Sequence, residues 1–106
     1  MLKSLVMEEE FNKFLHDNQN KLILVNFFTT WCFPCRELQQ NIEELLLERK
    51  DLAVLEIDAE KFPKLSQKTE FNVISVPSLF LFRQGKIVKK IGGLLSVLQL
   101  KQFIDS

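Results

Sequence analysis

The sequence has only two cysteines in 106 residues, Cys32 and Cys35, and two residues separate them. So few cysteines cannot form the set of disulfides that holds small secreted domains together. Histidine is scarcer still, since His16 is the only one. Structural zinc sites use four ligands, so a metal site built on this cysteine pair would have to be shared between chains.

The sequence also lacks an excess of charge of either sign. Fourteen Lys and Arg residues are balanced by fourteen Asp and Glu residues. A protein that binds nucleic acid or anionic lipid headgroups usually carries a basic surplus that neutralises phosphates. We therefore expect no nucleic-acid partner.

Long hydrophobic runs are absent as well. The most apolar stretch, Leu22–Phe28, is interrupted by Asn26 and is far shorter than the roughly 20 residues that span a bilayer. Residues 1–10 contain one lysine and three consecutive glutamates, without the apolar core of a signal peptide. We expect no membrane segment and, if this is the full precursor, a cytoplasmic protein.

What is present fits one globular domain over residues 1–106. Hydrophobic residues make up 46% of the chain and charged residues 26%, which is the balance of an ordinary folded domain. No internal repeat, low-complexity block or Pro/Gly/Ser-rich linker divides the sequence. A chain of this length buries a hydrophobic core without disulfide staples.

Hydrophobic spacing predicts an α/β fold with the element order β-α-β-α-β-α-β-β-α. We expect strands at 3–6, Leu22–Phe28, the alternating segment 52–57, 78–83 and 86–91, with helices at 8–17, 33–50, 62–71 and, after the cap Ser96, 97–104. Strands that alternate with helices and end in a hairpin predict a mixed sheet covered by helices on both faces.

The cysteine pair lies at the predicted junction between a central strand and a helix, in the segment Trp31-Cys32-Phe33-Pro34-Cys35. Backbone N–H groups and the helix dipole at a helix N-terminus stabilise a thiolate, so we expect a lowered pKa for Cys32. Cys35, one turn further along, is placed to close a disulfide with it. Half of a metal site and a pair of buried structural cysteines remain alternatives at this stage.

Several separate segments resemble the thioredoxin family, and the similarity extends over nearly the whole chain. The segment from Leu24 to Phe28 with Trp31 to Arg36 is similar to the family's active-site segment. A second segment, Val76-Pro77-Ser78-Leu79, resembles its cis-proline loop. Gly85 and Gly92 fall where the family has a turn and a glycine of the substrate groove.

This resemblance implies a thioredoxin fold, with a mixed sheet of about five strands flanked by about four helices. It implies that Cys32 is the nucleophile and Cys35 the resolving thiol of a protein-disulfide reductase. It also implies a cis bond before Pro77, a substrate segment that pairs with the backbone of Val76, and a groove lined by Trp31 and Gly92. Surface packing of Trp31 and strand termination at Gly92 are the simpler alternatives.

The expected partners are disulfide-containing proteins and a flavoprotein thioredoxin reductase. The resemblance implies no cofactor besides the redox-active Cys32–Cys35 disulfide, and we expect a monomer. A glutaredoxin-like role and a binding module with low turnover remain the alternative functions.

Asn26 departs from the family, which typically has a buried aspartate there that helps to take the proton from the resolving cysteine. An amide cannot accept that proton near neutral pH. The family's nearby lysine is replaced by Val54, so a coupled polar pair looks lost. We hypothesise that water or another route deprotonates Cys35 and that Asn26→Asp would speed disulfide reduction, the alternative being a hydrogen-bonded amide without catalytic effect.

The dipeptide between the cysteines is Phe33-Pro34. Phe33 replaces the family's usual glycine and adds a ring at the lip of the groove, which predicts altered substrate selectivity. Pro34 is retained and neither residue is ionisable, so we expect a reducing rather than a strongly oxidising potential.

Overall fold

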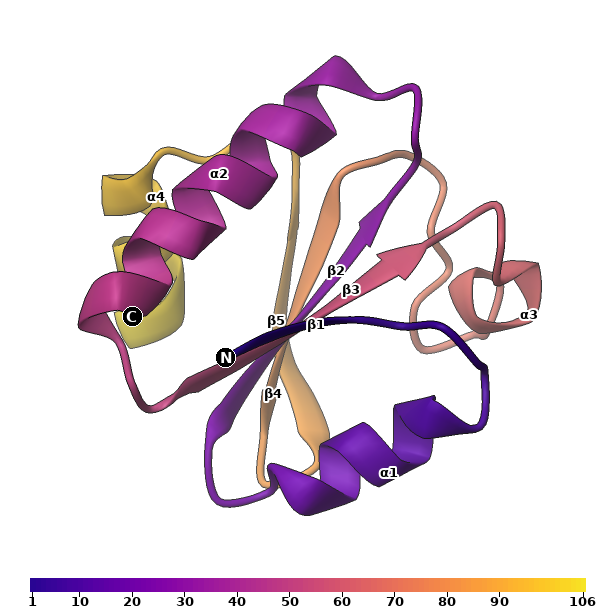
Figure 1. The fold of residues 1–106 in the computed structure, drawn as a ribbon, viewed down its shortest axis with the longest axis horizontal. Coiled ribbons are helices and arrows are strands. Elements are labelled where there is room, and N and C mark those ends of the chain that lie inside the picture. Colours follow the sequence, from indigo (N-terminus) through magenta and orange to yellow (C-terminus); the bar gives the residue numbers. More distant parts are fainter.

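The computed structural model describes all 106 residues and contains one five-stranded sheet in the order β1-β3-β2-β4-β5 (Figure 1). The strands are β1 (Leu2–Ser4), β2 (Leu22–Phe28), β3 (Leu52–Asp58), β4 (Ser78–Arg83) and β5 (Lys86–Gly92). The first three are parallel to one another, whereas β4 runs antiparallel to both β2 and β5. The predicted mixed sheet is therefore confirmed.

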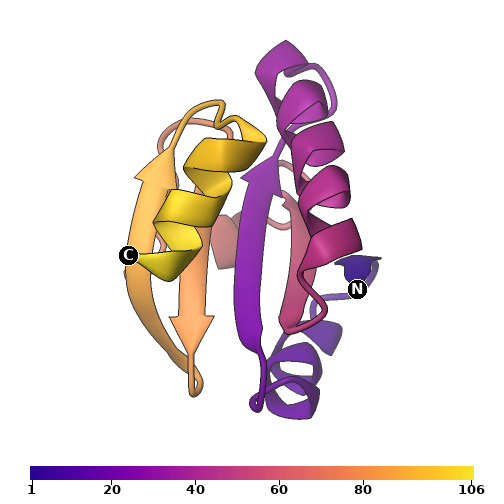
Figure 2. The same ribbon diagram turned by 90° about the vertical axis from the view of Figure 1, so that its left-hand side faces the viewer.

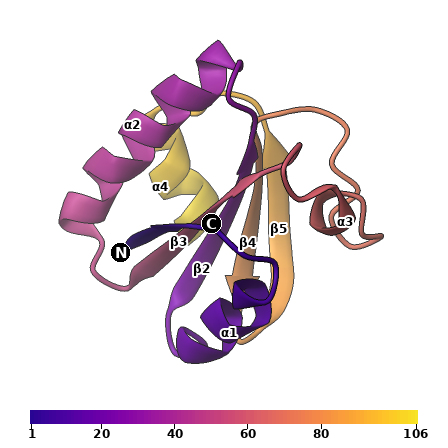
Figure 3. The same cartoon turned by 45° about the vertical axis from the view of Figure 1, so that its right-hand side comes forward.

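Four helices cover the sheet: α1 (Glu10–Asp17), α2 (Phe33–Glu48), α3 (Pro63–Ser66) and α4 (Val97–Asp105). Helices α2 and α4 lie together on one face, and α1 and α3 lie on the other (Figures 1 and 2). The same two layers of helices are seen on opposite sides of the sheet in Figure 3. The element order and the class of fold agree with those predicted.

Strands β2 and β3 lie at the centre and are buried on both faces. Side chains that alternate along them enter two separate apolar clusters, one beneath α1 and α3 and the other beneath α2 and α4. The alternating pattern expected for 52–57 is therefore wrong, because all six residues are buried. Helices on both faces of the sheet remove the exposed side that alternation requires.

The helix predicted over 62–71 is much shorter, since α3 ends at Ser66. The backbone turns at Asn72, which has a φ of 43°, and this bend carries Phe71 into the core. The Phe71 ring lies 5.0 Å from the ring centroids of both Phe27 and Phe80. Burial of this ring among other aromatic rings outweighs continuation of a helix.

Smaller differences concern the ends of the other elements. Helix α1 begins at Glu10 rather than at residue 8, because the Glu10 carboxylate accepts backbone N–H groups of Val6 and Met7 in the preceding turn. The predicted cap of α4 is confirmed: the Ser96 hydroxyl accepts the N–H of Gln99. No helix has the length and apolar character that crossing a membrane requires.

Candidate active site

The cysteine pair lies where β2 leads into α2. Cys32 occupies the N-cap of α2 with an extended backbone, and Pro34 follows in the first turn. Proline fits there because the first helical N–H groups have no partner within the helix and its own φ is already suitable. The short connection between β2 and α2 thus fixes both cysteines at one end of the sheet (Figure 1).

Cys32 and Cys35 form a disulfide, with their Cα atoms 5.3 Å apart. The backbone N–H of Cys35 also donates to Sγ of Cys32 over 3.2 Å. Cys32 is 5% exposed and Cys35 is 3% exposed. Once the disulfide is reduced, the same N–H group and the helix N-terminus stabilise negative charge on the Cys32 sulfur.

The loop before β4 comes close to this disulfide. The Val76–Pro77 peptide bond is cis, and the carbonyl oxygen of Val76 lies 4.0 Å from Sγ of Cys32. The carbonyl of Pro77 accepts the N–H of Gly93 over 3.0 Å, which joins the loop to the end of β5. Four residues that the sequence placed in one site, Cys32, Val76, Pro77 and Gly92, are thereby gathered from three distant parts of the chain.

Gly92 has no backbone conformation that requires glycine. A Cβ atom built there would meet only the carbonyl oxygen of Pro77, at 3.7 Å, which is an ordinary contact. Gly92 lines a hollow of about 380 Å³ together with Ile74 and Ser75. The fold therefore tolerates a small side chain at this position.

Large apolar side chains surround the buried disulfide at the surface. Phe33 is 80% exposed, Trp31 is 68% exposed and Ile74 is 89% exposed. The Trp31 indole N–H donates to the carboxylate of Glu60 over 3.0 Å, and the guanidinium of Arg36 lies 5.7 Å from the centre of the Phe33 ring. Exposed apolar residues gathered at one place mark a surface that contacts other molecules.

A second hollow, of about 510 Å³, lies between Trp31 and the loop that carries Ile74 and Val76. The two hollows flank this loop, so a groove is available on each side of it. Glu60 and Ile74 were not singled out from the sequence. Neither belongs to a recognisable motif, unlike Trp31 and Val76, which lie beside them in the structure.

Asn26 lies on β2, on the face that α2 covers, and is fully buried. Its amide nitrogen donates to Oε2 of Glu56 over 2.7 Å. Val54, in contrast, is aligned with Leu24 and belongs to the apolar cluster. The polar partner of Asn26 is thus a carboxylate that sequence reasoning missed, although an acid flanked by apolar residues in a central strand was a visible signal.

Glu56 is 2% exposed. Burial raises the pKa of its carboxyl to about 7, while the hydrogen bond from Asn26 opposes this rise and the negative charge of Glu43 adds to it. A buried carboxyl that titrates near neutral pH is typical of functional sites.

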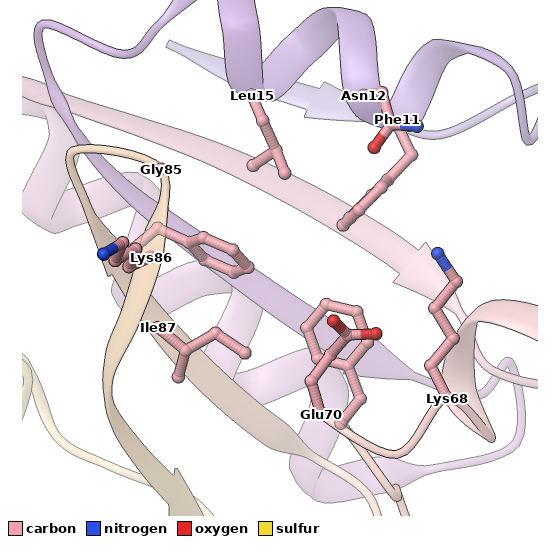
Figure 4. A pocket seen from close by; sticks show the side chains of 10 residues that line it. Phe11, Asn12, Leu15, Lys68, Glu70, Gly85, Lys86 and Ile87 are labelled. Carbon is pink, nitrogen blue, oxygen red and sulfur yellow. The ribbon is translucent and has the colours of Figure 1, made fainter.

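Another hollow, of about 370 Å³, lies between α1 and the β4–β5 turn, and shares no residue with the cysteine segment (Figure 4). Phe11 and Phe71 form part of its wall, and Lys68, Glu70 and Lys86 lie around it. No group of three His, Cys, Asp or Glu side chains anywhere in the chain is arranged to hold a metal ion.

The model of the thioredoxin family matches residues 3–106. Chloroplastic thioredoxin Y2 of Arabidopsis thaliana is 35% identical over 93% of this chain and 60% of its own length. Thioredoxin of Mycobacterium tuberculosis is 40% identical over 72% of this chain and 65% of its own length. The chain therefore spans less than two thirds of the length of these relatives.

The bifunctional thioredoxin reductase/thioredoxin of Mycobacterium leprae is 39% identical over 72% of this chain and 16% of its own length. Among solved structures, a mutant thioredoxin from Halobacterium salinarum superposes with a TM-score of 0.85 and 30% identity, covering 98% of this chain and 88% of the other. With the matched family model and the geometry of the cysteine pair, these similarities show that the chain belongs to the thioredoxin family.

Proposed function

We propose that this chain is a thiol–disulfide oxidoreductase that reduces disulfides in other proteins. The observation that carries the proposal is the Cys32–Cys35 disulfide at the N-terminus of α2, beside the carbonyl of Val76. Membership of the thioredoxin family supports the same activity. The cysteine pair itself carries the electrons, so the proposal needs no further cofactor.

The reaction follows from the position of each sulfur. The Cys32 thiolate attacks one sulfur of a substrate disulfide, a mixed disulfide forms, and the substrate's other sulfur leaves as a thiolate. The Cys35 thiol then loses its proton, and its sulfur attacks Sγ of Cys32. The Cys32–substrate bond breaks, the substrate leaves reduced by two electrons, and Cys32–Cys35 is oxidised.

The loop that carries Val76 and Pro77 supplies the substrate-binding part of the proposal. An extended substrate segment pairs with the backbone of Val76, as an added strand pairs with an exposed edge. Trp31 and Phe33 on one side and Gly92 on the other bound the groove that such a segment occupies. The exposed Phe33 ring is the feature that distinguishes which substrates enter.

A thioredoxin reductase is the proposed electron donor. The Mycobacterium leprae relative, named as a bifunctional thioredoxin reductase/thioredoxin, supports this pairing. One chain contains the whole exchange site, which favours action as a monomer. A reductant of this kind works in a reducing compartment, and we propose the cytoplasm.

The test is a coupled assay that contains NADPH, a thioredoxin reductase, the protein and insulin as disulfide substrate. We expect turnover by the unmodified chain, and none by Cys32→Ser or Cys35→Ser. The two variants separate the roles of the sulfurs: Cys35→Ser should retain substrate as a stable mixed disulfide, whereas Cys32→Ser should retain none. The reverse pattern would contradict the assignment, and substrate binding without turnover by the unmodified chain would indicate a binding module.

A further inference from the structure

Two polar side chains lie side by side in the otherwise apolar centre of the sheet. Asn26 of β2 is aligned with Glu56 of β3, and their side chains are joined by a hydrogen bond of 2.7 Å. Both are almost completely inaccessible to solvent. No lysine, arginine or histidine forms an ion pair with Glu56.

The pair holds two acceptor atoms without a donor. Oδ1 of Asn26 and Oε1 of Glu56 are both buried, and neither has a hydrogen-bond partner. Burying an unpartnered acceptor is unfavourable, so such atoms call for an explanation. A proton on Oε1 of Glu56 supplies the missing donor. Protonation of Glu56 therefore reduces the number of buried acceptors without a donor.

The surroundings of Glu56 favour that proton. The groups aligned with it on the neighbouring strands are uncharged, Ser4 on β1 and Asn26 on β2. From the covering helix α2, Glu43 contributes negative charge, which opposes ionisation of a second carboxyl. Burial acts in the same direction and brings the pKa of Glu56 to about 7, within the range where proton exchange is useful.

The pair also lies on the face of the sheet that the cysteines reach. Asn26 is two residues along β2 from Leu24, so both side chains point to the same face of the sheet. Leu24 belongs to the cluster beneath α2 and α4. Cys35 is buried in the first turn of α2, and Leu38, one turn further on, belongs to that cluster. The helix whose first turn holds Cys35 therefore covers the layer that contains the acid–amide pair.

We propose that Glu56, positioned by Asn26, takes up the proton that the Cys35 thiol loses when it resolves the mixed disulfide. The inference deepens the proposed function and rests on it. The proton passes from the Cys35 thiol to the Glu56 carboxylate, directly or through one water molecule. The Cys35 sulfur forms its bond to Cys32, and the electron pair of the broken bond leaves on the substrate sulfur, which is protonated by solvent.

The proposal places the proton-accepting acid on β3. The side chain at position 26 becomes the hydrogen-bond donor that holds the carboxyl. Glu56 is the proton acceptor for Cys35, and Asn26 is the residue that positions it. Its test therefore needs a pH profile and not only a rate.

The first experiment measures, by stopped flow between pH 5.5 and 8.5, the release of reduced substrate from the mixed disulfide with Cys32. The unmodified protein should show an inflection near pH 7. Glu56→Gln should lose this inflection and be roughly tenfold or more slower at pH 8, because the proton acceptor is gone. Glu44→Gln removes an exposed charge on α2 that does not act on Glu56, so it is the matched control and should retain the inflection.

An acid–amide exchange separates proton transfer from packing. The double variant Asn26→Asp/Glu56→Gln returns one carboxyl and one amide to the pair with the strands exchanged, and should recover a pH-dependent acceleration. An unchanged inflection in Glu56→Gln would overturn the proposal. So would a double variant that is as slow and pH-independent as Glu56→Gln.

The second experiment needs neither a variant nor a protein substrate. The ¹³C chemical shift of the Glu56 carboxyl is followed by NMR through a pH titration of the unmodified protein, first oxidised and then reduced with dithiothreitol. We expect the two redox states to give different midpoints for Glu56. Only the reduced protein has an ionisable thiol at Cys35, and two ionisable groups that interact shift each other's titration. Identical midpoints would overturn the proposal, even if the coupled assay shows turnover. Different midpoints without turnover would instead count against the proposed function alone.

Discussion

Ionisation of Glu56 should make the stability of this protein depend on pH in an unusual direction. The pKa of the carboxyl is about 7 in the folded chain, against an ordinary value of 4.5. Between these values the folded state binds more protons than the unfolded state. Its free energy of unfolding therefore falls as the pH rises through this window, whereas a carboxyl with a depressed pKa has the opposite effect.

The size of the effect follows from the difference between the two pKa values. Each unit corresponds to about 1.4 kcal/mol, so a difference of between two and three units corresponds to about 3 kcal/mol between pH 4.5 and pH 8. Glu56→Gln removes this contribution while keeping a side chain of similar size. Relative to the unmodified chain, its free energy of unfolding should rise by about this amount across the same window.

The assay is urea denaturation of the oxidised proteins at pH 4.5, 6 and 8, followed by far-UV circular dichroism. Circular dichroism is preferable to fluorescence because the one tryptophan, Trp31, is largely exposed and reports poorly on the core. Glu44→Gln serves as control, since it removes an exposed carboxyl that does not act on the pKa of Glu56. A difference between Glu56→Gln and the unmodified chain that stays constant from pH 4.5 to pH 8 would refute the reasoning.

Two further predictions concern the core and the groove. In urea denaturation, Phe71→Ala should lower the free energy of unfolding by about 3–5 kcal/mol, because Phe71 is 4% exposed and packs on other rings. Phe33→Ala, at the surface, should change it by less than about 0.5 kcal/mol. An equal loss of unfolding free energy in the two variants would contradict the packing described for Phe71. Gly92→Ala should fold normally, since its Cβ makes one ordinary contact, yet reduce insulin more slowly while its disulfide is reduced by dithiothreitol at an unchanged rate. Unchanged insulin reduction would mean that no substrate segment passes this position.

The fold was predictable because its main signals are local. The boundaries of β2 and the cap of α4 follow from an apolar run and from a serine placed before a periodic helix. The end of α3 was not predictable in the same way. The bend at Asn72 exists because Phe71 packs on rings from β2 and β4, and contacts between distant segments leave no periodic trace in the local sequence.

The residues of the active site also differ in whether local sequence reveals them. Cys32, Cys35 and Pro77 stand in short motifs, so the resemblance identified them before their proximity was known. Glu56 stands in no motif, and its role depends on the parallel register that aligns it with Asn26. A strand buried on both faces tolerates very few charged residues, so an acid between Leu55 and Ile57 in β3 was itself a signal that a partner had to exist.

The interpretation of Asn26 therefore depends on which neighbouring residue is considered with it. Taken with Val54, it suggests that a polar pair has been lost from beneath the cysteines. Taken with Glu56, it shows that a buried acid is present but is attached to the neighbouring strand. Asn26→Asp without a change at Glu56 would place two carboxyls in contact, and like charges this close raise the pKa of one of them strongly. The single substitution should therefore accelerate disulfide reduction less than the exchange of both residues does.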